Sequence, residues 1–222
     1  MQRKFVFSEG EFYHIYNRGV EKRNIFKDEK DRSRFVRLLY VANGERPFIF
    51  RDIENKIFSE IDRGKPIVAI GAYVLMPNHF HILLKEIVEG GISMFMEKLL
   101  TGYSSYFNKR NERTGALFQG TYQAKHADSD EYLKYLFAYI HLNPVKLIES
   151  EWKEKGIKNN TAARQFLEKY KHSSFLDFRQ IIREENAILS IKEFPDYFSK
   201  NKEFSDFIED WLKYRDNQIP NT

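Results

Sequence analysis

Residues 67–86 read IVAIGAYVLMPNHFHILLKE, two apolar runs joined by a turn that contains Pro and Asn, and this stretch decides the fold. Runs of this length, rich in β-branched and aromatic side chains and bounded by turn residues, are typical of strands. We therefore predict a β-hairpin with one strand at 67–75, a turn at 76–78 and a second strand at 79–86. We expect both strands to be central in a sheet and partly buried.

The second strand carries two histidines, His79 and His81, separated by one residue. Alternate side chains of a strand share a face, so both imidazoles point the same way. Two neutral imidazoles at this spacing can bind one divalent cation, which can polarise a phosphoryl oxygen or activate a nucleophile. A polar stripe on a half-buried strand is the other interpretation. The pair by itself therefore indicates only half of a metal site.

The segments on either side of the hairpin extend it into a pattern of strands and helices. Side-chain periodicity predicts strands at 11–16 and 117–125 and helices at 30–41, 91–108 and 129–142. Ser129 is the expected N-cap of the last helix, which stops at Asn143 because Pro144 follows. The resulting order, β-α-β-β-α-β-α, is typical of an α+β fold of the ferredoxin-like, split βαβ type. It has a four-stranded antiparallel sheet covered by helices.

Two parts of the chain lie outside this pattern. Residues 43–64 are polar and poorly patterned, and we expect a loop there with a short helix at 52–63. Beyond residue 150 the chain is rich in Lys and Glu, and helices are predicted at 161–171, 176–185 and 203–214. We therefore expect a main domain at 1–148 and a helical C-terminal extension at 149–222 that packs on it.

The composition excludes several classes of protein. Cysteine is absent, so the chain has neither a disulfide framework nor a thiolate metal site, and a metal would need His, carboxylate or amide ligands. The first residues lack the apolar core of a secretion signal, and no apolar run approaches the 18 residues or so that span a bilayer. We therefore expect a cytoplasmic protein with no membrane partner.

Positive charge is concentrated in the middle of the chain. The net charge is only +4, but the segment 98–126 contains five basic residues and one acidic residue. Such a segment can contact the phosphates of a nucleic acid, although an ordinary solvated turn is the other interpretation of its basic loop. The candidate phosphate contacts are Arg18, Lys109, Arg110, Arg113 and Lys125. Aromatic side chains at 103, 106, 118 and 122 could stack on bases, but we expect them to fill the core.

A second half of a site is predicted on the helix at 129–142. Tyr139 and Asn143 are four residues apart and therefore share a helical face. A tyrosine hydroxyl is a poor nucleophile because its pKa is near 10, but a cation beside a phosphate stabilises the charge that develops. Tyr135, one turn earlier, is the rival nucleophile. His126 and His141 are left out of the metal set, since His141 points away from Tyr139.

Several motifs in this order resemble those of a known family. They are the stretch 76–84 with its two histidines, YIHLNPVK at 139–146, YHIYNRG at 13–19, and two further segments at 106–108 and 113–122. Together they resemble the IS200-like single-tyrosine transposases of the HUH superfamily, and especially the REP-associated tyrosine transposase branch. The likeness covers about residues 10–148.

The resemblance implies a reaction and a ligand set. His79 and His81 would bind a divalent metal ion, Mg or Mn, and Asn143 would complete the protein ligands. Tyr139 would attack a phosphodiester of single-stranded DNA, forming a 5′-phosphotyrosine and freeing a 3′-OH that can later reverse the step. The implied substrate is single-stranded DNA that folds into a REP-like hairpin. A homodimer is compatible with the resemblance, since some relatives exchange the tyrosine helix between subunits.

Two alternatives remain open at this point. The chain could be a non-catalytic or domesticated DNA-hairpin-binding protein that keeps the fold, although the intact set of His79, His81, Tyr139 and Asn143 argues against this. The histidine pair could also serve hydrolysis by an activated water molecule, in which case the product would carry no protein adduct.

Overall fold

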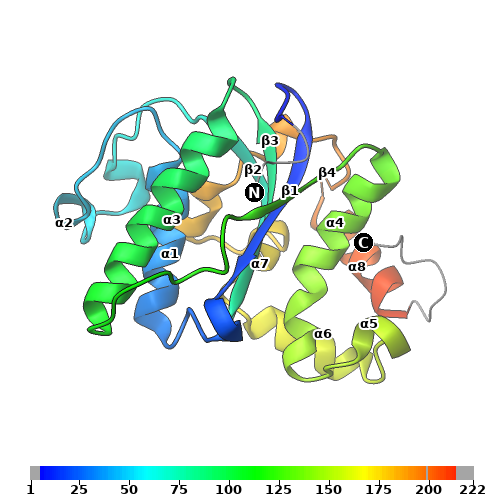
Figure 1. The fold of residues 1–222 in the computed structure, drawn as a ribbon. Helices are drawn as coiled ribbons and strands as arrows, with labels where there is room; N and C mark the ends of the chain where they lie inside the picture. The colour runs from blue at the N-terminus through cyan, green and yellow to red at the C-terminus, as the bar shows by residue number, and fades with distance from the viewer. Residues whose placement is uncertain (1–5, 199, 214–222) are drawn as a thin grey trace.

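The computed structural model describes residues 6–198 and 200–213 and is built around one four-stranded antiparallel sheet (Figure 1). The strands are β1 (Phe12–Arg18), β2 (Val68–Met76), β3 (His79–Glu86) and β4 (Gln123–His126), in the order β2-β3-β1-β4. Strand β3 is central as predicted, but the prediction that both hairpin strands are central is wrong for β2, which lies at the edge of the sheet. The connection from β1 to β2 crosses β3, and the connection from β3 to β4 crosses β1. This is the split βαβ arrangement, so the predicted ferredoxin-like fold is confirmed.

Helices cover both faces of the sheet. Figure 1 shows α1 (Glu29–Ala42) and α3 (Gly91–Arg110) on one side and α4 (Asp130–Leu142), α6 (Asn160–Lys169) and α8 (Asn201–Lys213) on the other. Helix α4 begins as predicted, because the Ser129 side chain accepts a hydrogen bond from the backbone N–H of Tyr132 at 3.2 Å. The shorter helices are α2 (Phe50–Ile53), α5 (Trp152–Lys155) and α7 (Phe175–Phe178). The 3-10 turns are Val20–Lys22, Phe58–Glu60, Asn143–Leu147, Glu184–Ile188 and Ile191–Glu193.

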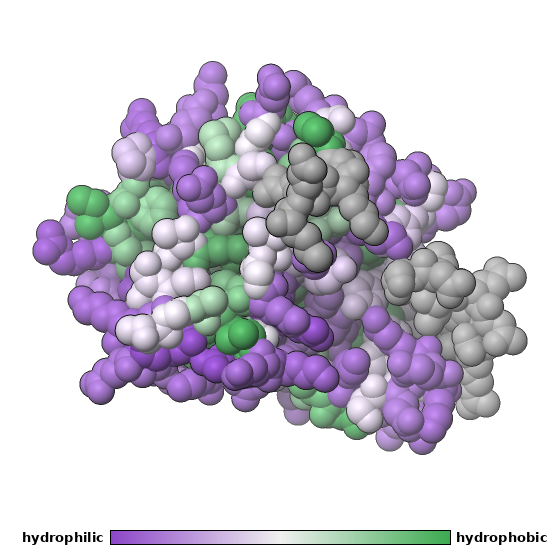
Figure 2. Space-filling view, in the orientation of Figure 1, coloured by the Kyte–Doolittle hydropathy of each residue, from purple (hydrophilic) through white to green (hydrophobic). Residues whose placement is uncertain are grey.

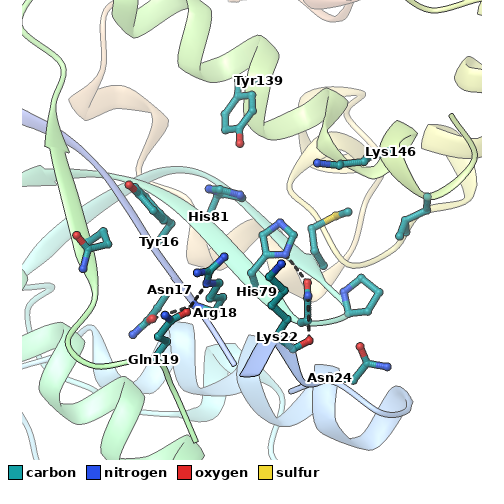
Figure 3. A pocket seen from close by; sticks show the side chains of 15 residues that line it. Tyr16, Asn17, Arg18, Lys22, Asn24, His79, His81, Gln119, Tyr139 and Lys146 are labelled. Carbon is teal, nitrogen blue, oxygen red and sulfur yellow. Dashed lines mark hydrogen bonds between the residues drawn. The ribbon is translucent and has the colours of Figure 1, made fainter. Parts of the chain in front are cut away.

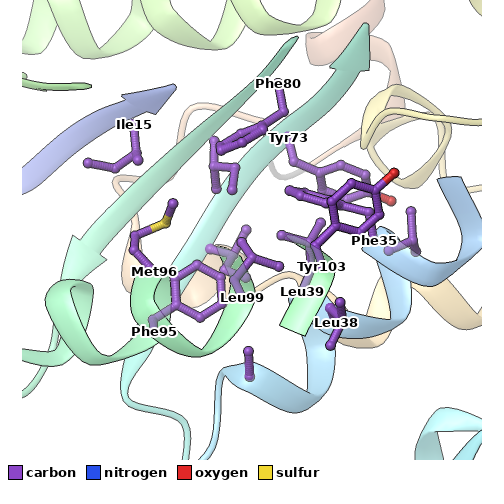
Figure 4. Close-up of a cluster of buried hydrophobic side chains, with 14 of the residues drawn as sticks. Ile15, Phe35, Leu38, Leu39, Tyr73, Phe80, Phe95, Met96, Leu99 and Tyr103 are labelled. Atoms are coloured by element: carbon purple, nitrogen blue, oxygen red, sulfur yellow. The ribbon is translucent and has the colours of Figure 1, made fainter. Parts of the chain in front are cut away.

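The two faces of the sheet form two separate hydrophobic clusters. We call the cluster under α1 and α3 the first core; Figure 4 shows Ile15, Phe35, Tyr73, Phe80 and Tyr103 within it. The second core lies under α4 and the C-terminal helices. On the face drawn in Figure 2, hydrophilic side chains predominate and hydrophobic ones form small groups among them. The strand alternation explains the division, since neighbouring side chains of one strand enter different cores.

The C-terminal extension packs directly on the sheet. A β-bridge joins Val74 to Ser173, and the Tyr170 hydroxyl donates to the carbonyl of Leu75 at 2.6 Å. At Gly71, beside a register shift between β2 and β3, an added Cβ atom would lie 2.6 Å from the Phe194 ring. The extension therefore shares the second core with α4, as the expected packing requires. Whether 1–148 and 149–222 fold as separate units stays a prediction.

Three predicted elements are shorter than expected. Of the strand predicted at 117–125, only the last part pairs with β1, because the chain first crosses the end of β1 and turns at Gly120, where φ is +69°. In the insert, α2 and a 3-10 turn replace a helix at 52–63, and Arg37 donates to the carbonyl of Lys56 at 2.5 Å. Helix α7 replaces the helix at 176–185, because the chain adopts a positive φ of 57° at Gln180.

The other predicted elements are found close to their predicted bounds, except that position 214 lies outside the described residues. Among the residues that the structure describes, no helix is both long enough and apolar enough to cross a membrane.

Candidate active site

A pocket of about 820 Å³ lies where the ends of β1 and β3 face the end of α4 (Figure 3). His79 and His81 reach it from β3, Tyr139 from α4, and Arg18 from β1. The same lining includes Lys22 and Lys146, and it contains no Asp or Glu within the described part of the chain. The pocket therefore gathers positive charge without a carboxylate to balance it.

The strand register places the two histidines on the pocket side. Tyr16 of β1 pairs with His81 and Arg18 pairs with His79, so these four side chains share the face that α4 covers. His81 is 6% exposed and His79 is half-buried. The two imidazoles therefore lie on the same face of the sheet, as predicted.

Each histidine is held through Nδ1. Nδ1 of His81 lies 2.9 Å from Nε2 of His14, and Nδ1 of His79 lies 2.6 Å from Oδ1 of Asn78. In the tautomer in which Nδ1–H donates these bonds, Nε2 of both rings carries the lone pair that a metal ion needs. The sequence did not predict His14 as a site residue. It belongs to the motif YHIYNRG at 13–19 and, two residues before Tyr16 on β1, shares the face of that side chain.

Burial keeps these imidazoles neutral. Desolvation lowers the pKa of His79 to about 4 and that of His14 to about 3, and it lowers the pKa of His81 well below the usual value. Charges on Lys146 and Lys153 add to the effect on His79 and His81. Near neutral pH both rings are therefore in the form that binds metal ions.

Tyr139 faces the histidines from the opposite side of the pocket. Its ring centroid lies 5.2 Å from that of His81 at an interplanar angle of 77°, and its hydroxyl points from α4 toward the histidines (Figure 3). Burial raises the pKa of Tyr139, while a hydrogen bond from Asn143 and the charge of Lys146 oppose that rise. The phenol is therefore neutral near pH 7 and needs positive charge nearby to become a nucleophile.

Asn143 is the residue directly after α4, and it is not among the residues that line the pocket. It is 3% exposed, and its side-chain amide lies close enough to both residues, Tyr139 and His79, to lower the pKa of Tyr139 and to oppose the lowering of the pKa of His79. Its backbone N–H donates to the carbonyl of Tyr139, so α4 holds the two residues one helical turn apart, as predicted. The amide is thus within reach of both the proposed nucleophile and an imidazole.

The donor set fits a divalent cation. Two neutral imidazoles and one amide oxygen are acceptable ligands for such an ion and leave positions open for substrate oxygens. Among the described residues, no group of three or more His, Asp or Glu side chains forms a metal cluster.

The rival nucleophile Tyr135 and the two histidines left out of the metal set, His126 and His141, lie outside the pocket lining. Tyr135 stacks on Tyr139 at 5.9 Å and packs against Trp211 in the second core. His141 is fully buried, with Nε2 2.8 Å from Oγ of Ser174, and His126 lies 2.7 Å from a carboxylate oxygen of Glu11. The partners of the two histidines therefore do not line the pocket.

The five predicted phosphate contacts fall into two groups. Arg18 lines the pocket and its Nε donates to Oε1 of Gln119, while Lys125 pairs in register with His14 on the same face. The other three lie at or beyond the end of α3, outside the pocket lining; they are Lys109, Arg110 and Arg113. Of these, Arg110 forms ion pairs with Asp28 and Asp31.

Two lysines near the tyrosine were not predicted as site residues. Lys146 lines the pocket three residues after Asn143 and was part of a quoted motif. Lys153 of α5 places Nζ 3.9 Å from the centroid of the Tyr139 ring. No sequence pattern indicated Lys153, because its position depends on how α5 folds back along α4.

Comparison with known proteins identifies the family. Residues 12–143, more than half of the chain, match the sequence profile described as "Transposase IS200 like". The chain belongs to the IS200-like transposase family. The matched segment contains both histidines, Tyr139 and Asn143, so all four candidate site residues of this transposase lie inside it. The family indicates a DNA-cleaving enzyme, and HUH-type transposases generally use a divalent metal ion.

A solved structure shares the fold of this IS200-like transposase. It is described as "Structure of the REP associates tyrosine transposase bound to a REP hairpin" and aligns with a TM-score of 0.50 and 13% sequence identity. The alignment covers 83% of this chain and 90% of that chain. At this identity the likeness concerns the fold. A search of curated proteins finds no match.

Proposed function

We propose that this transposase cuts and rejoins single-stranded DNA that contains a hairpin, through a covalent 5′-phosphotyrosine on Tyr139. The observation that carries the proposal is the placement of the Tyr139 hydroxyl opposite His79 and His81, in a pocket lined by cationic side chains and by no carboxylate of the described chain. A phosphodiester is an anion, and a site of this charge favours it.

The proposed reaction is a transesterification with Tyr139 as the nucleophile. The Tyr139 oxygen forms a bond to phosphorus while the bond from phosphorus to the 3′-oxygen breaks, and the proton lost by the phenol is balanced by the one gained at the freed 3′-OH. One ester replaces another, so the step needs neither water nor an energy source. Reversal with a new 3′-OH rejoins the strand.

His79, His81 and Asn143 would hold a divalent ion, Mg or Mn. When bound, such an ion stabilises the negative charge that develops on the phosphate. His14 fixes the ring of His81 through Nδ1, and Asn78 does the same for His79. The protein thus contributes neutral, oriented imidazoles, and the side-chain amide of Asn143 lowers the pKa of the phenol.

The DNA would approach along the positive side chains. Arg18 and Lys125 are the proposed phosphate contacts nearest to the pocket, and Lys109, Arg110 and Arg113 would act farther along the strand or on the hairpin stem. The hairpin itself is proposed because a solved structure that shares this fold is described as a REP-associated tyrosine transposase bound to a REP hairpin. We place the protein in that branch on the same ground.

The test is a search for the covalent adduct. Labelled hairpin DNA with single-stranded flanks is incubated with protein and Mn or Mg, and the mixture is denatured and run on a gel. We expect an adduct with the wild type, none with Tyr139→Phe, and an undiminished adduct with Tyr135→Phe, the stacked neighbour outside the pocket lining.

Other outcomes of the same gel have definite meanings. Cut DNA without any adduct would indicate hydrolysis by activated water and would overturn the phosphotyrosine mechanism. Tight binding without cutting on any hairpin would indicate a non-catalytic DNA-binding protein. Loss of the adduct when a chelator replaces the metal is the expected result for the proposed ligand set.

A further inference from the structure

Lys153 brings a positive charge to the ring of Tyr139 from outside the family-matched segment. That segment ends at residue 143, and Lys153 belongs to α5, the first helix of the C-terminal extension. Its Nζ lies 3.9 Å from the Tyr139 ring centroid, which is within the range of a cation–π contact. The extension therefore touches the side chain that the proposed reaction uses.

This ammonium is half-buried and has no matching anion. Burial lowers the pKa of Lys153, with only the neighbouring charge of Glu154 opposing the change. Among the described residues no carboxylate lies within ion-pair distance of Lys153, whereas Lys155 of the same helix forms an ion pair with Glu151 at 2.8 Å. Holding an ammonium partly out of water without a partner is costly, and a bound anion would offset that cost.

Lys146 supplies a second charge to the same place. It lines the pocket, is exposed to solvent, and like Lys153 forms no ion pair within the described part of the chain. The charges of both lysines act on the histidine pair, and that of Lys146 also acts on Tyr139. Lys146 thus lies in the pocket itself, whereas Lys153 lies outside the pocket lining, on the ring of Tyr139.

We propose that Lys146 and Lys153 form an anion seat that contacts the DNA phosphate transferred to Tyr139. The inference rests on the proposed function and deepens it, because it assigns contact with the transferred phosphate to two residues that the fold brings near the tyrosine. In the free protein Lys153 lies on the Tyr139 ring; in the complex its ammonium reaches an oxygen of the phosphodiester that the ring oxygen attacks. The C-terminal extension is then a part of the active site.

The main test measures DNA binding without cleavage. In a Tyr139→Phe background, affinity for a hairpin with single-stranded dT flanks is measured at several salt concentrations. Removing one phosphate contact in single-stranded DNA reduces the slope of log affinity against log salt by about 0.7. We expect this reduction for Lys153→Met and Lys146→Met, its recovery in Lys153→Arg, and no change in Lys155→Met, the matched control on the same helix.

A second measurement uses the intact tyrosine. Losing a donor to a developing charge costs on the order of 100-fold in rate, so Lys153→Met should slow adduct formation to that extent and Lys153→Arg should restore most of it. If Lys153 only holds α5 against α4, Lys153→Met would lower the melting temperature and leave the salt slope unchanged, which would overturn the proposal.

The two proposals can fail separately. If the wild type forms an adduct while both lysine variants keep the wild-type slope and rate, the anion seat is wrong and the phosphotyrosine mechanism stands. If no adduct forms but the slope falls in the lysine variants and not in Lys155→Met, the seat binds DNA phosphate and the catalytic proposal is wrong. Should Lys153→Met fail to fold, Lys146→Met and Lys153→Arg still decide the slope.

Discussion

The two faces of strand β3 have opposite characters, although their residues alternate along the same eight positions. Phe80, Ile82 and Leu84 are fully buried in the first core, where nothing but hydrophobic packing is required of them. His79 and His81 point to the other face, where each imidazole has a polar partner and borders a pocket. One face stabilises the fold, and the other carries the candidate chemistry.

The difference shows how a buried polar site is tolerated. Polar groups taken out of water need partners, and His14 and Asn78 are the partners of the two imidazoles. The apolar face needs only close packing. Substitutions on the two faces should therefore affect different measurements, and the following variants test that separation.

The largest effect on stability is expected on the apolar face. Phe80→Ala removes a fully buried ring and should lower the free energy of unfolding by about 3–5 kcal/mol. The matched truncation next to it on the site face, His79→Ala, should cost about 1 kcal/mol or less. Urea unfolding of both variants measures the contrast, and equal losses would show that the two faces are not separated in this way.

The second prediction concerns the histidine that holds His81. His14→Phe keeps a ring but removes the nitrogen that lies 2.9 Å from Nδ1 of His81. Loss of such an orienting partner should weaken Mn binding about 10- to 100-fold. Calorimetry with Mn measures it in the absence of DNA. His126→Phe, on β4 and outside the pocket lining, should bind Mn as the wild type does; an equal loss there would point to general disruption of the sheet.

The third prediction tests how the C-terminal extension is attached to the site face. Ser174 accepts from the backbone N–H of Tyr73 at 3.0 Å and lies 2.8 Å from Nε2 of His141. Ser174→Ala leaves these buried groups without a partner and should lower the free energy of unfolding by about 1–3 kcal/mol. The exposed Ser105→Ala is the control, with a change expected within about 0.5 kcal/mol. Wild-type stability of Ser174→Ala would contradict this role.

The smallest effect is expected for phosphate contacts. Arg18 lines the pocket, so Arg18→Gln should reduce the salt slope of DNA binding by about 0.7 for a single-stranded contact. Arg110 is already paired with Asp28 and Asp31 on the side of the first core, and Arg110→Gln should reduce the slope less. A larger reduction for Arg110 would move the DNA path toward the end of α3.

Local patterns predicted much of the fold. The apolar runs at 67–86 give β2 and β3, and Ser129 with the following acidic residues gives the start of α4. Local patterns failed at 117–122, where apolar Leu117 and Phe118 resemble a strand but fill the first core. They failed again at Gln180, where the chain adopts a positive φ that no helical period predicts and the expected helix is interrupted.

The sequence by itself determined the family, the common direction of His79 and His81, and the shared helical face of Tyr139 and Asn143. These follow from periods of two and 3.6 residues, which are local properties of a strand and a helix. Tertiary structure alone decided that His14 meets His81, 67 positions away, that Lys153 lies on the Tyr139 ring, and that α4 faces the histidines. These contacts arise from strand register and helix packing, which depend on long-range burial rather than on any short stretch of the chain.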